Sequence, residues 1–210
     1  MADLLNSRRS FLTAIATSAV IACGGGGSSA PTKVAPAAVV YQSGDSITQQ
    51  SGQLLAEYLP AGSTVINRGL PGQQAFNMVN GDYGSLPPLV AGAVYTYSFG
   101  ANECLNGRGV GFYITYLEAA IIYTKGFVTV IEAPWQLVNP ANQCGDLSPS
   151  YQAATASLIN KYSSVAGYKV SMAALDTDRS HDGAGIHLLE PHARLRMSLL
   201  GQAIELALVH

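Results

Sequence analysis

Residues 39–58, VVYQSGDSITQQSGQLLAEY, contain a complete strand–turn–helix unit. The apolar residues 39–41 predict a buried strand, and the Gly44-Asp45 pair that follows is typical of a turn. From Ser51 to Tyr58 the apolar side chains recur at helical spacing, which predicts a helix. A buried strand followed directly by a helix is the repeating unit of α/β proteins.

The same alternation of strands and helices continues almost to the end of the chain. The later apolar runs are rich in Val, Ile, Tyr and Thr, and they alternate with longer segments of helical spacing. The predicted strands are 39–41, 64–66, 93–99, 127–133 and 168–175, and the predicted helices are 51–58, 112–123, 148–165 and 191–208, with Pro149 suited to a first helical turn. Continuously apolar strands separated by helices indicate a parallel sheet covered on both faces. We therefore expect an α/β fold, a three-layer α/β/α sandwich with a five-stranded parallel sheet.

Composition and charge exclude several classes of protein. Of the 210 residues, 48% are hydrophobic and 11% are charged, so the chain can bury one sizeable core and is not disordered by charge. Lys and Arg number 11 against 13 Asp and Glu, which gives a formal net charge of −2. Because there is no basic excess to neutralise phosphates, nucleic acid is not an expected partner.

The N-terminus has the order of features found in an export signal. Arg8 and Arg9 precede the largely apolar residues 11–22, which are short for a membrane span and end in small residues before Cys23. The run SRRSFL resembles a twin-arginine signal, and VIAC at 20–23 resembles the lipobox where bacterial lipoproteins are cleaved and acylated. The resemblance implies a signal peptide over 1–22, a lipid on Cys23, and a membrane-anchored protein of the bacterial cell envelope, periplasmic or at the cell surface.

Residues 23–36, CGGGGSSAPTKVAP, have the composition of a flexible tether. They would connect the lipidated Cys23 to a folded domain over 37–210. The alternative is an ordinary amphipathic N-terminus in which Cys23 occurs by chance.

Two further cysteines, Cys104 and Cys144, fall in predicted loops. In an exported chain they can form a disulfide, and two free buried thiols are the alternative. Neither belongs to a CxxC pair, and the sequence has no HExxH motif, so no metal site is predicted.

Glycines and polar residues follow the carboxyl ends of the predicted strands, where open parallel sheets bind ligands. GDSIT (44–48) follows the first strand, NRGLPG (67–72) the second, GANE (100–103) the third and DTDRSHDGAGIH (176–187) the fifth. A serine, glycine amides, an amide side chain and a histidine with nearby carboxylates would therefore meet at one edge of the sheet. These are the groups that acyl transfer requires.

Each of these groups has a chemical role. The hydroxyl of Ser46 is a weak nucleophile at neutral pH, so it needs an imidazole such as His187 to take its proton, and the imidazole needs a carboxylate to fix its tautomer. The backbone N–H groups of Ser46 and Gly72 and the side-chain amide of Asn102 can donate to the oxyanion, and such donors stabilise the transition state by roughly 3–4 kcal/mol each. No metal or organic cofactor is needed for this chemistry.

The blocks GDSIT, NRGLPG, GANE and GIHL, in this order, resemble blocks I, II, III and V of the SGNH (GDSL) hydrolase family. The resemblance implies a flavodoxin-like fold over residues 37–210 and a Ser-His-Asp triad that hydrolyses esters, thioesters and acetyl groups on lipids or carbohydrates. By position in the blocks, Ser46 is the expected nucleophile and His187 the base. Gly72 and Asn102 are then the expected oxyanion donors together with the N–H of Ser46.

The triad carboxylate departs from the family pattern. Family members place the aspartate three residues before the histidine, but Ala184 stands there and the sequence reads DGAGIH. Asp182, five residues before His187, can serve if the loop bulges, and the two glycines of the loop favour a bulge. The rival pair is His181 with Asp178, which keeps the usual spacing. We favour His187 because GIHL is followed by an apolar helix as in the family, and the choice of carboxylate stays open between Asp182 and Asp178.

The expected function is a serine esterase acting on short-chain acyl or acetyl esters of a small molecule or polysaccharide. One alternative is a catalytically inactive envelope lipoprotein of the same fold with a binding or structural role, which the displaced aspartate favours. Another is an acyltransferase that passes the acyl group to a sugar hydroxyl. The sequence has no GxSxG motif, which argues against the lipases of the α/β-hydrolase class.

Overall fold

A computed structural model describes residues 34–134, 144–174 and 187–210. Residues Lys33–His210 form one compact unit. The predicted signal peptide over 1–22, Cys23 and the tether as far as residue 33 lie outside the described residues.

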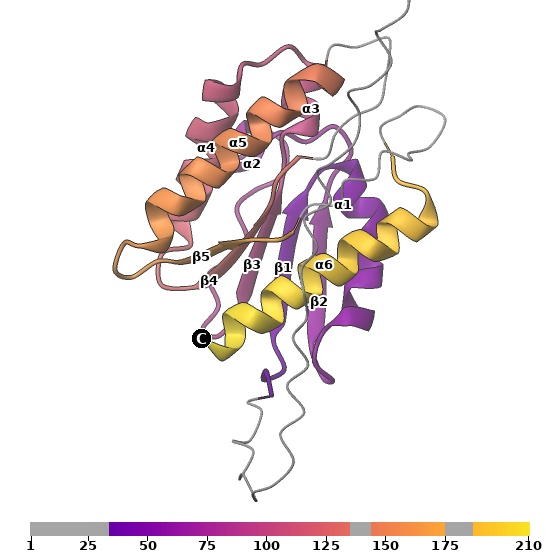
Figure 1. Cartoon of the computed structure of the whole chain (residues 1–210), viewed down its shortest axis with the longest axis vertical. Coiled ribbons are helices and arrows are strands. Elements are labelled where there is room, and N and C mark those ends of the chain that lie inside the picture. The colour runs from indigo at the N-terminus through magenta and orange to yellow at the C-terminus, as the bar shows by residue number, and fades with distance from the viewer. Residues whose placement is uncertain (1–33, 135–143, 175–186) are drawn as a thin grey trace, which may run out of the picture. The chain divides into compact units, whose positions relative to one another are not determined.

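Five parallel strands form one sheet in the order β2-β1-β3-β4-β5 (Figure 1). The strands are β1 (Val39–Gly44), β2 (Thr64–Gly69), β3 (Val94–Ser98), β4 (Val128–Glu132) and β5 (Lys169–Met172). Every residue of β3, and every residue of β1 after Val39, is buried, as expected for strands covered on both faces. The five-stranded parallel sheet of the α/β prediction is therefore confirmed.

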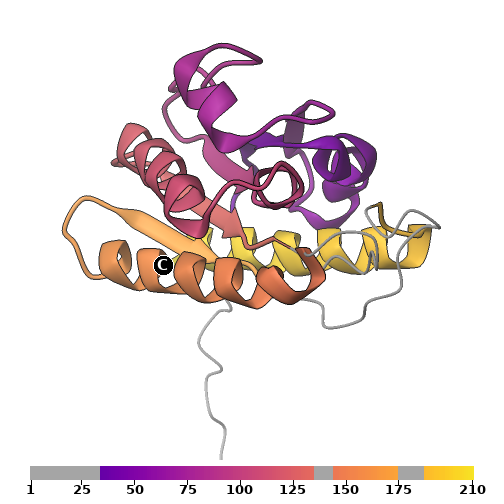
Figure 2. The same ribbon diagram turned by 90° about the horizontal axis from the view of Figure 1, so that it is seen from above.

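Helices cover both faces of this sheet (Figures 1 and 2). They are α1 (Ser46–Ser51), the 3-10 helix η1 (Gly52–Tyr58), α2 (Ala75–Asn80), α3 (Ala101–Leu105), α4 (Val110–Tyr123), α5 (Cys144–Ser163) and α6 (Glu190–Val209). On one face α4 contacts α2 and α5, and buried side chains such as Tyr95 and Tyr113 fill the core beneath them. On the other face α6 packs against η1 over a second core that includes Val40 and Leu200. The three-layer sandwich is confirmed.

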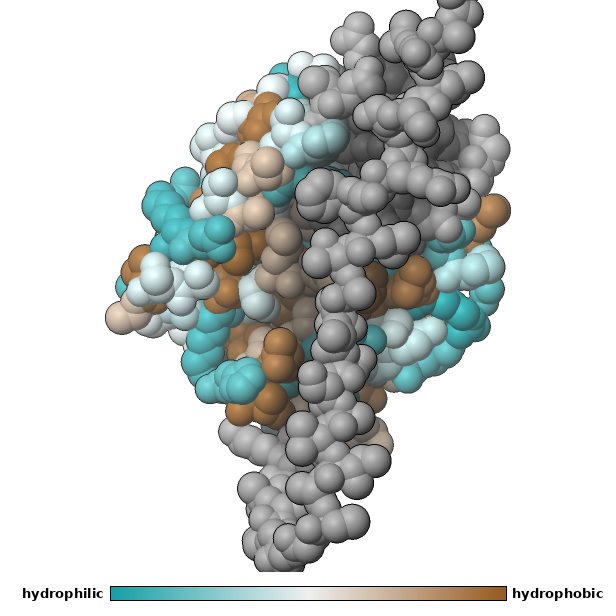
Figure 3. Space-filling model, in the orientation of Figure 1, coloured by the Kyte–Doolittle hydropathy of each residue, from teal (hydrophilic) through white to brown (hydrophobic). Residues whose placement is uncertain are grey.

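The outer edge of β5 is open in the described part of the chain. A groove of about 470 Å³ runs along it, lined by residues of β5 and α6 that include Val170, Met172 and Leu206. Figure 3 shows hydrophobic surface on this face of the molecule, between α5 and α6. Among the residues that the structure describes, no predicted site residue lines this groove.

The first helix begins earlier than the sequence predicts. The prediction was a helix over 51–58, but α1 begins at Ser46 and the stretch from Gly52 to Tyr58 is a 3-10 helix. Asp45 was predicted to lie in a turn, whereas its side chain caps α1. The 3-10 helix begins at Gly52, where a Cβ would lie 2.3 Å from the Asn67 side chain, so glycine permits close packing on β2 at this point.

Three other helices differ from the prediction. The short helices α2 and α3 were not predicted, because segments of six and five residues are too short to show an amphipathic period. Cys104 consequently lies in α3 and not in a loop. The helix predicted from residue 148 begins at Cys144, so Cys144 also lies in a helix and Pro149 lies inside α5 and not in its first turn. Among the described residues, no helix is long and apolar enough to cross a membrane.

Candidate active site

Ser46 is the first residue of α1 and lies at the carboxyl end of β1. Asp45 caps this helix, because its Oδ1 accepts a hydrogen bond of 2.9 Å from the N–H of Ile47. Gly44 permits close packing of this turn on β3, since a Cβ at this position would lie 2.7 Å from the carbonyl oxygen of Ser98. The strand therefore passes into the helix within two residues, which holds Ser46 on a fixed backbone.

His187 lies beside Ser46 although 141 residues separate them in sequence. Its Nε2 atom is 3.0 Å from Ser46 Oγ, which is hydrogen-bonding distance. The adjacent Leu188 is held to the same helix, because Gln50 of α1 donates a hydrogen bond of 3.2 Å to its carbonyl oxygen. Ser46 and His187 thus have the geometry of a nucleophile and its base.

Of the two expected oxyanion donors outside α1, Gly72 lies in the loop after β2 and Asn102 lies in α3. Gly72 has φ of +74°, and a Cβ there would meet no atom within 4 Å, so the backbone conformation and not lack of space requires glycine. Asn102 is half-buried in α3, and its Nδ2 donates a hydrogen bond of 3.2 Å to the carbonyl oxygen of Gln73. Because Gln73 follows Gly72 directly, this bond joins the loop that carries Gly72 to α3, the helix that carries Asn102.

Glu103, which was not predicted as a site residue, connects the start of α3 to the start of α2. One of its carboxylate oxygens accepts a hydrogen bond of 2.6 Å from the N–H of Ala75, and the other accepts one of 2.9 Å from the N–H of Gly100. Burial raises the pKa of Glu103 to about 7, against the lowering effect of these hydrogen bonds. An acidic residue at the third position of a helix is the signal that could have revealed this capping role.

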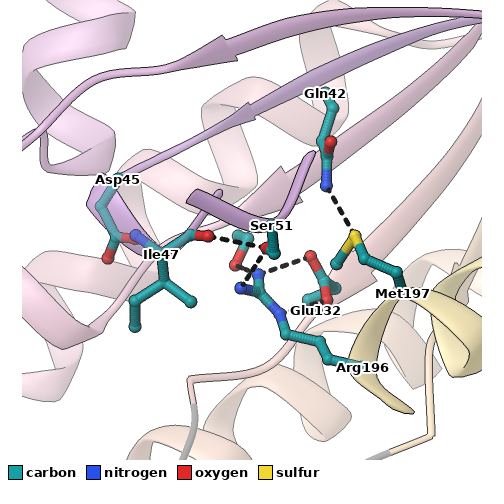
Figure 4. Close-up of polar contacts among 8 residues, drawn as sticks. Gln42, Asp45, Ile47, Ser51, Glu132, Arg196 and Met197 are labelled. Atoms are coloured by element: carbon teal, nitrogen blue, oxygen red, sulfur yellow. Dashed lines mark hydrogen bonds and ion pairs between the residues drawn. The ribbon is translucent and has the colours of Figure 1, made fainter. Parts of the chain in front are cut away.

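Asp45 is a second buried carboxylate, 3% exposed, next to the predicted nucleophile. Burial raises its pKa to about 6, while the positive charge of Arg196 and the N–H groups of Ile47 and Thr48 lower it. Figure 4 shows Asp45 with Arg196 and Glu132. Arg196 and Glu132 were not predicted as site residues either, because nothing in their local sequence sets them apart from a surface ion pair.

Several predicted residues lie outside the described part of the chain. Asp182, Asp178 and His181 belong to the segment 175–186, so the choice between the two carboxylates and the rival pairing of His181 with Asp178 stay predictions. Among the described residues, no group of three or more His, Cys, Asp or Glu side chains is arranged to hold a metal ion.

Cys104 is disulfide-bonded. It lies in α3, two residues after Asn102. The side chain of Cys144 lies outside the description, so the pairing of Cys104 with Cys144 stays a prediction.

Comparison with known proteins identifies the fold. No family model and no curated protein matches the chain by sequence. Among solved structures, a member of the lipolytic protein G-D-S-L family from Veillonella parvula superposes with a TM-score of 0.59 at 14% identity, over 77% of this chain and 94% of that one. An acetylxylan esterase from Geobacillus stearothermophilus superposes with a TM-score of 0.56 at 13% identity, over 85% and 97%.

A family 3 carbohydrate esterase from Clostridium thermocellum superposes with a TM-score of 0.57 at 18% identity, over 83% of this chain and 100% of the esterase. The chain therefore has the α/β fold of the GDSL (SGNH) lipolytic proteins and esterases. At identities this low the likeness defines the fold, and the chemistry has to be argued from the site.

Proposed function

We propose that the protein is a serine esterase of the SGNH type. The observation that carries this proposal is the distance of 3.0 Å between Ser46 Oγ and His187 Nε2 at the carboxyl edge of the sheet. Ligands bind at this edge in open parallel sheets, and a serine paired with an imidazole there is equipped for nucleophilic attack.

In the proposed reaction His187 Nε2 accepts the proton of Ser46 Oγ as the oxygen attacks the ester carbonyl. The C–O bond of the leaving alcohol then breaks, and the protonated imidazole donates its proton to that oxygen. The N–H groups of Ser46 and Gly72 and the amide of Asn102 donate hydrogen bonds to the carbonyl oxygen while it is negatively charged. The hydrogen bond from Asn102 to Gln73 uses one amide hydrogen and leaves the other for the oxyanion.

Water releases the acyl group by the same steps in reverse, with His187 again taking the proton. A carboxylate at the second ring nitrogen would stabilise the protonated His187, and we assign this role to Asp182. The chemistry needs no metal or organic cofactor.

We propose short acyl or acetyl esters on a small molecule or polysaccharide as the substrate. The support comes from the structures that share the fold, two of which are described as an acetylxylan esterase and a carbohydrate esterase. The sequence of residues 1–36 supports an envelope protein anchored through a lipid on Cys23.

A fluorophosphonate probe tests the proposed nucleophile, since it reacts with activated serines. The wild-type protein should take up one label per chain, and Ser46→Ala should take up none. Ser157→Ala is the matched control, because Ser157 is exposed on α5 and bonds only to the carbonyl oxygen of Ala153 among the described residues. Release of acetate from acetylated xylan should follow the same pattern.

A folded wild-type protein that takes up no label would refute the esterase and favour the inactive lipoprotein. Product analysis with a polyol present separates hydrolysis from acyl transfer, because a transferase would form the acetylated polyol.

A further inference from the structure

Arg196 and Glu132 form a buried ion pair beside Ser51, on the helix that begins with Ser46 (Figure 4). Arg196 is 1% exposed and Glu132 is 4% exposed. The pairing is bidentate, with Arg196 Nε 2.7 Å from one carboxylate oxygen and Nη2 2.8 Å from the other. A fork of two parallel hydrogen bonds fixes the orientation of the guanidinium as well as its position.

The guanidinium joins the ends of two strands to the helix that carries the proposed nucleophile. Glu132 and Ser98 are the last residues of β4 and β3 and are paired in register, and Arg196 Nη2 donates to Ser98 Oγ over 2.6 Å. Arg196 Nη1 donates to Ser51 Oγ of α1 over 3.3 Å. Ser51 Oγ in turn donates over 2.7 Å to the carbonyl oxygen of Ile47, the residue after Ser46.

Arg196 itself belongs to α6, the helix that begins three residues after His187. Its side chain therefore connects the element that follows the proposed base to the element that begins with the proposed nucleophile. The bond from Gln50 to the Leu188 carbonyl is a second link between the same two parts of the chain.

A buried ion pair is a poor means of adding stability. Removing two charges from water is unfavourable, and replacing a buried pair by apolar residues of similar volume is often neutral or stabilising. Removing one partner alone is strongly destabilising, because the other charge is left buried. What apolar residues could not reproduce here is the set of directed hydrogen bonds to Ser51, Ser98 and Glu132.

We propose that Arg196 is a positioning residue that, through Glu132, Ser98 and Ser51, fixes α1 relative to α6 and so keeps Ser46 Oγ within hydrogen-bonding distance of His187 Nε2. The inference rests on the proposed esterase function. Arg196 does not touch the reacting atoms in this account; it acts through Ser46 and His187.

The test separates positioning from stability with the double variant R196M/E132L. R196M alone leaves Glu132 buried and unpaired, so its Tm should fall, whereas the double variant should recover most of the wild-type Tm. The kcat of the double variant should stay about 100-fold below wild type with KM within about twofold, because a small misplacement of reacting groups lowers the chemical step and not ground-state binding. A purely structural role predicts that kcat recovers together with Tm, and that result would overturn the proposal.

R194M is the matched control. Arg194 lies on the same helix and pairs with Glu190 and Glu57, but these residues are exposed. R194M should leave kcat and KM unchanged.

S51A tests the link to α1 while leaving the Arg196–Glu132 ion pair in place. It removes the hydroxyl between Arg196 and Ile47 and should lower kcat several-fold with little change in Tm. If the double variant fails to fold, a wild-type kcat in S51A overturns the proposal.

The nitrogen NMR signal of the His187 ring separates failure of this inference from failure of the proposed function. S46A should shift this signal by removing the hydrogen bond, and R196M/E132L should shift it in the same direction. An inactive wild-type protein refutes the esterase, yet the signal still decides whether Arg196 holds the two residues together. An unchanged signal in the double variant overturns the positioning role.

Discussion

Replacement of Asp45 by asparagine should change how the stability of the protein depends on pH. Burial raises the pKa of Asp45 from 3.8 to about 6, which means that the native state holds this proton more tightly than the unfolded state. The resulting contribution to stability is fully present below pH 3.8 and is lost as the pH rises through about 6. Above both of these pKa values, the free energy of unfolding has lost about 3 kcal/mol through this group.

Asparagine retains an oxygen that can accept the hydrogen bond from the N–H of Ile47, and it carries no charge to bury. Between about pH 4 and about pH 8, the free energy of unfolding should therefore fall by about 3 kcal/mol more in the wild type than in D45N. Urea denaturation across this range measures the difference. Glu103 titrates in both proteins, and its contribution cancels only in part when the two curves are subtracted, because the charge of Asp45 is one of the causes that raise the pKa of Glu103.

D82N provides the control, since Asp82 is exposed and its replacement removes the same charge without a change in burial. Its curve should run parallel to that of the wild type. If the D45N curve also runs parallel to the wild type, burial of the Asp45 carboxylate does not carry the free energy assigned to it.

Three further predictions concern the site, the disulfide and the anchor. N102A should lower kcat for an acetyl ester by about 100-fold, because it removes an oxyanion donor, and a kcat within a few-fold of wild type in steady-state assays would exclude Asn102 from that role. Under oxidising conditions C104S and C144S should each lower the free energy of unfolding by about 4 kcal/mol, the value expected for a closed loop of about 40 residues, and unequal losses in denaturant titrations would argue against their pairing. In a bacterial host C23S should move the protein from the membrane fraction to the soluble fraction, and an unchanged distribution on immunoblots would contradict a lipid anchor at Cys23.

The strands were predicted well because burial leaves a local trace in the sequence. In β3, Val94 to Ser98 are all buried, and the run of aromatic and β-branched residues shows this without reference to any other part of the chain. The start of α1 was missed because Asp45 suits both a turn and a helix cap, and only the hydrogen bond to Ile47 distinguishes the two.

Some residues of the candidate site could likewise be predicted from the sequence, and others could not. Ser46 and His187 could be brought together from their blocks and from the rule that strand ends share one edge. The pairing of Arg196 with Glu132, 64 residues away, could not be predicted, since no local pattern distinguishes a buried charge from a solvated one. For Glu103, the position in α3 indicates a helix cap, but the hydrogen bond from the N–H of Ala75 could not be predicted because it depends on the folded chain.

Because Cys104 is disulfide-bonded, the redox conditions under which the protein is prepared should affect its activity. The disulfide is attached to the same short helix as Asn102, so thiol reductants in a purification buffer would remove a covalent constraint on the helix that carries this proposed oxyanion donor. Material produced in a reducing cytosol and material secreted into an oxidising space would then differ in turnover while sharing one sequence. Rates measured on the two should be compared only after the oxidation state of the sample has been verified.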